Sequence, residues 1–163
     1  MRASLEQHLG SRQVGRVVYG SIIGMALVVT LDSHPPSASV MTLWLLGTAV
    51  AVALAEIYSE VVGVETSTRK PVRRSQLHPM VEDAVAVGFG VSFPAVFFLL
   101  AALGVLSIDT AFSVAKWSGL FLIGFYGYWA ARFSGATLGG ALLKGGMVAL
   151  VGAGLIALKA LVH

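Results

Sequence analysis

Five long apolar runs constrain this chain more than any other feature of its sequence. They alternate with short polar segments and lie at residues 14–31, 40–62, 81–106, 111–131 and 138–161. A helix needs roughly 17–25 predominantly apolar residues to cross the hydrocarbon core of a bilayer, and each run is about that long. Of the 163 residues, 56% are hydrophobic and only 12% are charged. We therefore predict an all-α membrane protein: one transmembrane domain of five transmembrane helices in the cell membrane.

The basic residues between the runs predict how the chain is oriented. The most basic segment lies between the second and third runs and contains Arg69, Lys70, Arg73 and Arg74. Short loops rich in Lys and Arg stay in the cytoplasm. An even number of runs separates this segment from the other basic residues flanking the runs, Arg2, Arg12, Arg16 and Arg132. The N-terminus is therefore predicted in the cytoplasm and the C-terminal His163 outside. Segment 69–74 would also suit anionic lipid headgroups, although orientation alone accounts for it.

Two carboxylates interrupt the second apolar run. Glu56 and Glu60 lie four residues apart, so on a helix they share one face and repel each other. An intramembrane carboxylate costs about 2.5–3.5 kcal/mol even on lenient insertion scales. Their position near the predicted C-terminal end of a helix adds an unfavourable dipole. A bound cation, a proton, or a Lys or Arg side chain from another helix would each balance them.

A second pair of acids, Glu82 and Asp83, follows His78-Pro79 at the start of the third run. One interpretation is that they complement the helix dipole in a first turn. The other is that they share a cytoplasmic mouth with the first pair, which gives a candidate cation site of Glu56, Glu60, Glu82 and Asp83. Such oxygen ligands suit Mn, Mg, Ca or Fe(II). Lys144 in the fifth run, at a depth matching Glu56, is a candidate charge partner that would neutralise this site instead.

Prolines and small residues predict where helices bend, end and approach one another. Pro94, in the middle of the third run, should kink its helix. Close helix packing is expected at three pairs of small residues: Gly20/Gly24, Gly135/Gly139 and Ala141/Gly145. Asp32 and His34, next to two prolines, predict a solvated turn, and an external metal or proton site is the alternative.

Several classes of function find no support in the sequence. The chain has no cysteine, which excludes disulfides and thiolate metal sites. It has no phosphate-binding loop, nucleophile elbow or His-Glu-x-x-His motif, and no histidine lies in the middle of an apolar run. We therefore expect no enzymatic activity. The basic residues follow the topology and do not alternate with aromatics, so we expect no nucleic-acid partner.

Short motifs along most of the chain match one known family. They are Arg16-Val-Val-Tyr19-Gly20 in the first run, Glu56-Ile-Tyr58-Ser59 in the second, His78-Pro79 and Phe93-Pro94 in the third, and a glycine-rich stretch over residues 124–152. In these motifs the chain resembles the vacuolar iron transporter family, which includes vacuolar iron and manganese importers. The resemblance implies five membrane helices, a homodimer with its pathway between subunits, and a metal-binding role for Glu56.

The chain also departs from that family at three places. The family's first-helix aspartate falls on Ile23 and its second-helix methionine on Val52, neither of which can ligate a cation. Its cytoplasmic metal-binding helices between spans two and three are absent, and only the basic segment stands there. The chain resembles a minimal member of the family.

Two functions follow as competing predictions. The first is a multipass transporter of a divalent cation of the iron or manganese type, with Glu56 as the intramembrane ligand and no other cofactor. The second is a non-transporting membrane protein of the same fold with a structural or partner-binding role, favoured by Ile23, Val52 and the positive charge of Lys144. In both cases the lipid bilayer is a predicted partner of the chain. We predict a homodimer from the small-residue faces at Gly20/Gly24 and in the fifth run, and from the family resemblance.

Overall fold

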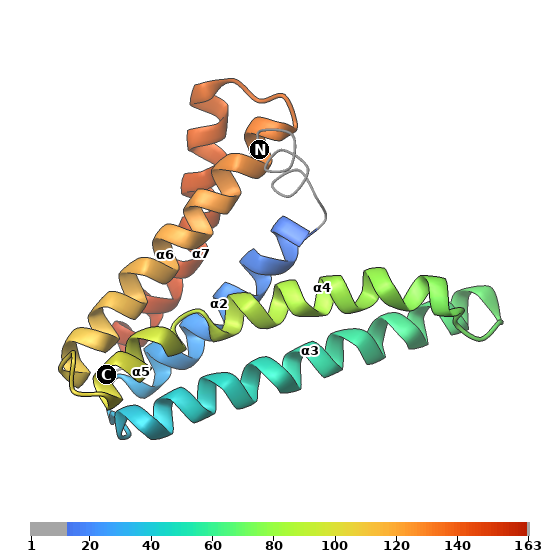
Figure 1. Ribbon diagram of the computed structural model, residues 1–163. Coiled ribbons are helices and arrows are strands. Elements are labelled where there is room, and N and C mark those ends of the chain that lie inside the picture. Colours follow the sequence, from blue (N-terminus) through green and yellow to red (C-terminus); the bar gives the residue numbers. More distant parts are fainter. Residues whose placement is uncertain (1–12, 163) are drawn as a thin grey trace.

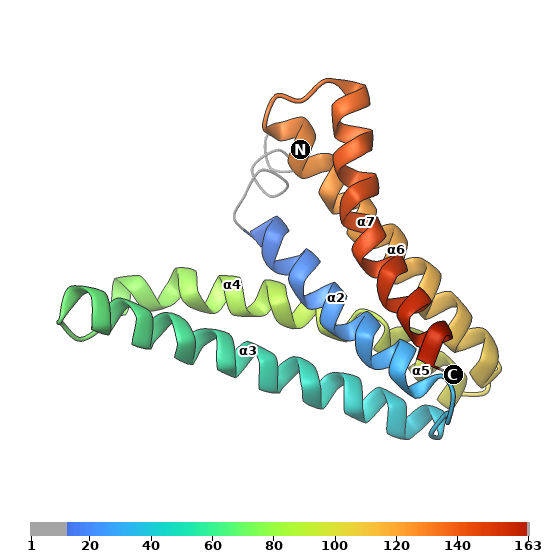
Figure 2. The same cartoon turned by 180° about the vertical axis from the view of Figure 1, so that it is seen from behind.

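The computed structural model describes residues 13–162, and every regular element in that range is a helix. The helices are α2 (Gln13–Leu31), α3 (Ala38–Thr68), α4 (Arg74–Ser92), α5 (Ala95–Ala102), α6 (Ile108–Phe133) and α7 (Leu138–Val162). They form a V, in which α3 and α4 make one arm, α6 and α7 make the other, and α2 runs between them (Figures 1 and 2). The predicted all-α class is confirmed. The predicted cytoplasmic tail with Arg2 and Arg12, and the C-terminal His163, lie outside the described residues.

Two of the described helices, α2 and α3, are each long and apolar enough to cross a membrane. A third crossing is added when α4 and α5 are counted as one bent span. These helices agree with the predicted membrane-protein class. The number of five spans and the orientation stay predictions.

The break between α4 and α5 confirms the expected effect of Pro94. The two helices are bent by 48° relative to each other. Proline has no N–H to continue the helix and its ring clashes with the preceding turn. After the break, the Phe97 N–H bonds to the carbonyl of Pro94 at 3.1 Å, three residues back, so the chain restarts as a tight turn. The third apolar run is therefore one broken segment.

The helices of the α3–α4 hairpin extend beyond the predicted runs. The start of α4 is fixed by Arg73, whose N–H bonds to the Gln76 side chain at 2.9 Å, so Pro79 lies inside the helix. Glu82 and Asp83 are consequently not in a first turn, and the dipole interpretation of this pair is wrong. The dipole argument for Glu56 and Glu60 also fails, because α3 continues to Thr68 and a helix dipole acts mainly on the last turn.

Glycines bring the backbones of α2 and α4 into contact. A Cβ added at Gly20 would overlap the carbonyl oxygen of Val87, and one at Gly24 would lie 2.7 Å from that of Val91. From the other side, a Cβ at Gly90 would lie 2.6 Å from the backbone N of Ser21. This confirms close packing through small residues. It also corrects one basis for the homodimer, because the Gly20/Gly24 face is covered by α4 of the same chain.

The other two small-residue pairs have different outcomes. A Cβ added at Gly145 would lie 2.9 Å from the carbonyl oxygen of Gly124, so Gly145 of α7 packs on α6 as expected. Gly135 instead has a φ of 84° and turns the chain after α6. Among residues 13–162, no atom lies within 4 Å of a Cβ added at Gly139, so the pair Gly135/Gly139 makes no close contact with the described part of the chain.

The largest group of buried apolar side chains lies where the arms of the V meet. Phe98 of α5 and Phe112 of α6 stack edge to face with ring centroids 4.8 Å apart, and both are almost completely buried. Val28, Met41 and Leu45 complete the same cluster from α2 and α3. This core joins the two arms at the vertex. Closer to its N-terminal end, α2 packs against α4 of the α3–α4 arm.

Candidate functional site

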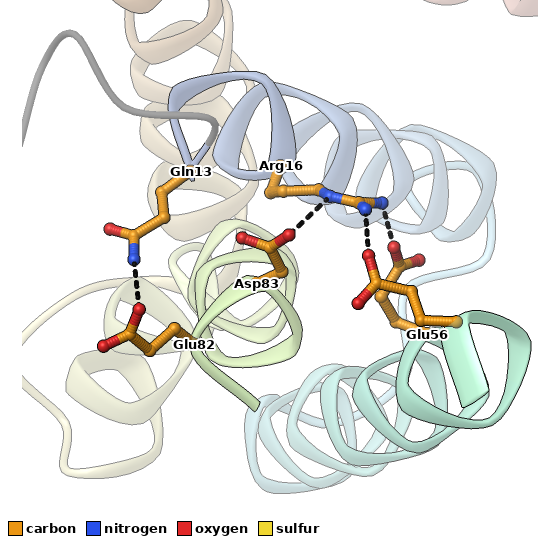
Figure 3. Close-up of polar contacts among 6 residues, drawn as sticks. Gln13, Arg16, Glu56, Glu82 and Asp83 are labelled. Atoms are coloured by element: carbon orange, nitrogen blue, oxygen red, sulfur yellow. Dashed lines mark hydrogen bonds and ion pairs between the residues drawn. The ribbon is translucent and has the colours of Figure 1, made fainter. Parts of the chain in front are cut away.

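One arginine lies among three carboxylates where α2 meets the α3–α4 arm (Figure 3). The Arg16 guanidinium donates through Nη1 to Glu56 Oε1 and through Nη2 to Glu60 Oε1. Its Nε lies 3.6 Å from Asp83 Oδ2. The contacts join α2 to both α3 and α4. We call these four residues the Arg16 cluster.

Helix geometry explains why these side chains converge. Glu56 and Glu60 are one turn apart on α3 and therefore both face α2. Arg16, Gly20 and Gly24 are spaced by four residues on α2, so the arginine lies on the glycine face that contacts α4. Close approach of the two backbones brings the guanidinium within reach of Asp83. A guanidinium presents several donors in one plane, which suits it to more than one carboxylate.

The cluster is largely shielded from solvent. Side-chain exposure is 14% for Glu56, 18% for Glu60, 8% for Asp83 and 29% for Arg16. Charges removed from water cost several kcal/mol each unless paired, and breaking such a pair is correspondingly costly. The Arg16 cluster is therefore a structural link between three helices, made of ionisable side chains that are largely removed from water.

Glu82 lies on a different side of α4 from its neighbour Asp83. Consecutive helix residues do not face each other, and the Glu82 side chain is 49% exposed. It accepts a long hydrogen bond from Gln13 Nε2 at 3.4 Å and lies 3.4 Å from His78 Nδ1. It lines a separate cavity of about 460 Å³ with Phe89 and other residues. The structure thus brings together three of the four predicted carboxylates and leaves Glu82 apart.

The charge partner of Glu56 is Arg16, in place of the predicted Lys144. Lys144 lies on α7, in the other arm of the V, and is exposed. It lines a hollow of about 370 Å³ with Val14, Ser134 and others, away from α3. From the sequence, Arg16 was assigned to the cytoplasmic side and to a family motif, and not to a contact with Glu56. Its spacing from Gly20 and Gly24 was the signal that would have placed it on the packed face of α2.

A cavity of about 490 Å³ adjoins the cluster between α3 and α4. Two carboxylates of the cluster, Glu60 and Asp83, line it. The rest of its lining is both polar and apolar: Ser67, Ser75, Gln76, Gly63, Val64, Pro79 and Met80. It extends from the cluster towards the α3–α4 hairpin. Water and small cations therefore have room to approach two of the three carboxylates.

The guanidinium occupies the place that a metal ion would need. Within residues 13–162, no group of three or more His, Asp or Glu side chains has an arrangement suited to a metal ion. The oxygen donors of the cluster suit hard cations, but such an ion would have to displace Arg16. Ile23 and Val52, the positions that carry ligands in the resembling family, pack against the buried residues Ala49, Val87 and Val91.

A second charged contact lies at the opposite end of α2. Lys116 of α6 donates to Asp32 Oδ2 at 2.8 Å, and the two side chains are 23% and 33% exposed. Residues 32–34 form the predicted turn, in which His34 is exposed. Asp32, at the start of this turn, also helps to join α2 to α6. No signal in the local sequence links these two residues, which are 84 positions apart.

No protein-family model, no curated protein and no solved structure matches this chain. Its functional interpretation therefore depends on the geometry described above.

Proposed function

We propose that this chain is a multipass membrane protein that moves a cation across the bilayer, and that the cation competes with Arg16 for the carboxylates of the cluster. The observation that carries the proposal is that Glu56, Glu60 and Asp83, from two helices, surround one guanidinium beside a cavity that Glu60 and Asp83 line. Ionisable groups inside a membrane commonly mark ion pathways. Displacement of the guanidinium would free an oxygen-lined site for the cation.

The proposed topology has five crossings, with α4 and α5 together forming the third. The α3–α4 connection and the α6–α7 turn lie at the open ends of the V, and the start of α2 lies between the arms on the open side. The α2–α3 and α5–α6 connections lie at the vertex (Figure 1). This arrangement supports a topology in which successive spans cross the bilayer in alternating directions. The basic residues of segment 69–74 and Arg132 then assign the open ends to the cytoplasm of the cell.

The proposed substrate is a divalent cation of the iron or manganese type. The resemblance to the vacuolar iron transporter family implies this class, and carboxylate oxygens suit Fe(II) and Mn(II). Glu56 is the position carried over from that family. Because Ile23 and Val52 are part of an apolar cluster, the remaining ligands in this proposal are Glu60 and Asp83.

A non-transporting membrane protein is the second candidate function. The observation that favours it is that Arg16 already bridges three helices through the same carboxylates. In this case the cluster is a structural link, and no cation replaces the guanidinium.

Uptake into proteoliposomes tests the first function directly. The wild type is expected to take up Mn²⁺ or Fe²⁺, and Glu56→Ala is expected to abolish uptake. The neighbours Asp83 and Glu82 provide a matched pair, because only Asp83 lies in the cluster. Asp83→Asn should strongly reduce uptake, whereas Glu82→Gln should leave it unchanged. Absence of uptake by the wild type across a panel of divalent cations would reject transport.

Thermal unfolding of Arg16→Gln distinguishes the two functions. A cation that binds only the folded state stabilises it by about 2.7 kcal/mol at a concentration 100 times its Kd. If the cation and Arg16 compete, Mn²⁺ should raise the unfolding midpoint of Arg16→Gln more than that of the wild type. A midpoint independent of Mn²⁺ in both proteins would favour the structural function.

The homodimer also stays a proposal, and of the two small-residue faces first expected only the one in the fifth run, on α7, is left for it. Gly139 and Gly146 of α7 lie seven residues apart, hence on one side of the helix. An added Cβ at either would meet no atom of residues 13–162 within 4 Å. This side of α7 can approach a second copy closely. A monomeric mass in both mild detergent and nanodiscs would reject the homodimer.

A further inference from the structure

The tip of the α3–α4 hairpin, residues 68–76, gathers positive charge. Arg69, Lys70, Arg73 and Arg74 are all exposed there. Within residues 13–162, none of the four forms an ion pair. Glu65, the nearest acid along the chain, instead accepts a hydrogen bond from the Val72 N–H at 3.3 Å. The tip therefore presents basic groups whose charges no described carboxylate neutralises.

The backbone of the tip encloses a cavity between two of these basic residues. Arg69 ends α3 in the left-handed conformation, with a φ of 53°, and α4 begins only five residues later at Arg74. The resulting cavity of about 410 Å³ is lined by Lys70, Arg73 and the polar side chains of Thr68, Ser75 and Gln76. The Thr68 hydroxyl donates to the Val64 carbonyl at 2.7 Å. The two cations, the Ser75 hydroxyl and the positive end of α4 are groups that donate hydrogen bonds to phosphate oxygens.

The length of α3 puts this cavity at the level of lipid headgroups. Its 31 residues extend about 46 Å at 1.5 Å per residue. The hydrocarbon core of a bilayer is about 30 Å thick, and the headgroup layers bring the total to about 40–45 Å. The start of α3 follows the polar turn at residues 32–37. If that turn lies at one surface, the tip, which is the part of the arm farthest from the vertex (Figure 1), reaches the opposite headgroup layer.

We propose that the hairpin tip binds the phosphate of an anionic lipid headgroup in the cavity between Lys70 and Arg73. The lipid would anchor the far end of the α3–α4 arm, whose inner part carries the Arg16 cluster. This inference is independent of cation transport, since it requires only that the tip lie at a bilayer surface. Phosphatidylglycerol supplies the required chemistry, whereas phosphatidylcholine carries a quaternary ammonium beside its phosphate and has no net charge.

Native mass spectrometry of the purified full chain in mild detergent tests the proposal. Dioleoyl-phosphatidylglycerol and dioleoyl-phosphatidylcholine are titrated separately, and the affinity of the first bound lipid is measured. We expect phosphatidylglycerol to bind roughly tenfold more tightly or better, and Lys70→Gln/Arg73→Gln to lose most of that preference, because basic residues near an anionic surface each add to binding. Equal affinity of the two lipids for the wild type overturns the proposal.

Two further variants separate the cavity from general positive charge. Arg132→Gln/Lys144→Gln removes the same charge from exposed positions of the other arm and should keep the preference. Arg69→Gln/Arg74→Gln removes it from the tip but leaves the two cations that line the cavity, and should have a smaller effect than Lys70→Gln/Arg73→Gln. Equal losses in all three double variants would show that net charge alone attracts the lipid, and would overturn the assignment to the cavity.

A titration with inorganic phosphate alone tests whether the bound phosphate belongs to a lipid or is free phosphate. We expect millimolar phosphate to bind the lipid-free protein much more weakly than phosphatidylglycerol does. The contrary result is that inorganic phosphate binds more tightly than the lipid and that Lys70→Gln/Arg73→Gln abolishes this binding. It would show that the cavity binds free phosphate and would overturn the proposal of a lipid ligand.

Discussion

The two ends of α2 are both tied to other helices by charged contacts, but in different ways. Near its start, the Arg16 guanidinium is shared by three carboxylates of α3 and α4. Just after its end, Asp32 meets the ammonium of Lys116 on α6. The first contact joins three helices through a planar group with several donors, and the second joins two helices through a point charge. The difference predicts that the chain tolerates changes at the Asp32 end far better than at the Arg16 end.

Burial adds to this difference. The carboxylates around Arg16 are 8–18% exposed, whereas Asp32 is 33% exposed and Lys116 is 23% exposed. Water can therefore take over part of the solvation of Asp32 when its partner is lost, but much less of that of Glu56 or Asp83. The Arg16 end is the place where a single substitution should have both structural and functional consequences.

The largest expected effect is that of Arg16→Met. The substitution leaves buried carboxylates without the guanidinium, and removal of one partner of a buried pair costs roughly 3–5 kcal/mol. We expect the lower end of that range, because Arg16 is 29% exposed. Unfolding in mild detergent with increasing SDS measures the loss. Lys116→Met is the matched control and should cost about 1 kcal/mol; equal losses would remove the distinction between the two ends.

The middle of α2 should be the next most sensitive part, because it sets the alignment of the Arg16 end. Gly20→Ala adds a Cβ against the carbonyl of Val87, and overpacking of this kind costs roughly 1–3 kcal/mol. Gly15→Ala on the same helix meets no atom of the described residues within 4 Å and should gain up to about 1 kcal/mol from helix propensity. We expect the two substitutions to change the free energy of unfolding in opposite directions, as measured by the same unfolding assay. A neutral Gly20→Ala would contradict backbone contact between α2 and α4.

Exchange of arginine and lysine sharpens the comparison with a smaller effect. Arg16→Lys keeps the charge but loses the planar set of donors, so it should cost about 1–2 kcal/mol, since hydrogen bonds to charged groups contribute on that scale. Lys116→Arg should stay within about 0.5 kcal/mol, because Asp32 needs only one donor at this contact. The thermal unfolding midpoints of the two variants, measured in the same detergent, test this prediction. If Arg16→Lys proved as stable as the wild type, the sharing of the guanidinium by three carboxylates would not be what stabilises this end of α2.

The smallest expected effect concerns Lys144. Because Glu56 contacts Arg16 and Lys144 lies on the other arm, the effects of Lys144→Met and Glu56→Gln should add within about 0.5 kcal/mol. The double-mutant cycle on unfolding free energy measures this. Recovery of stability in the double variant would show that the two residues meet after all.

Several features of the protein follow from local sequence. The all-helical structure follows from the long apolar runs, since a chain in lipid must satisfy its backbone hydrogen bonds internally. The break at Pro94 follows from the missing N–H of proline, and the close packing at Gly20, Gly24 and Gly145 from the absence of a side chain. The need of Glu56 and Glu60 for a positive partner also follows from their spacing and their apolar surroundings. These are consequences of each residue's own chemistry and its neighbours along one helix.

Only the tertiary structure decided which groups meet. Helix periodicity predicts that two residues share a face, but not which helix that face touches, because any small-residue face can accept any other. The packing of α2 on α4 placed Arg16, and not Lys144, at Glu56, and brought in Asp83 while leaving its neighbour Glu82 on another side. The same packing covered Gly20 and Gly24, one of the two faces first assigned to a homodimer. The crossing of helices distant in sequence is set by the fit of their whole surfaces, and no local pattern contains that information.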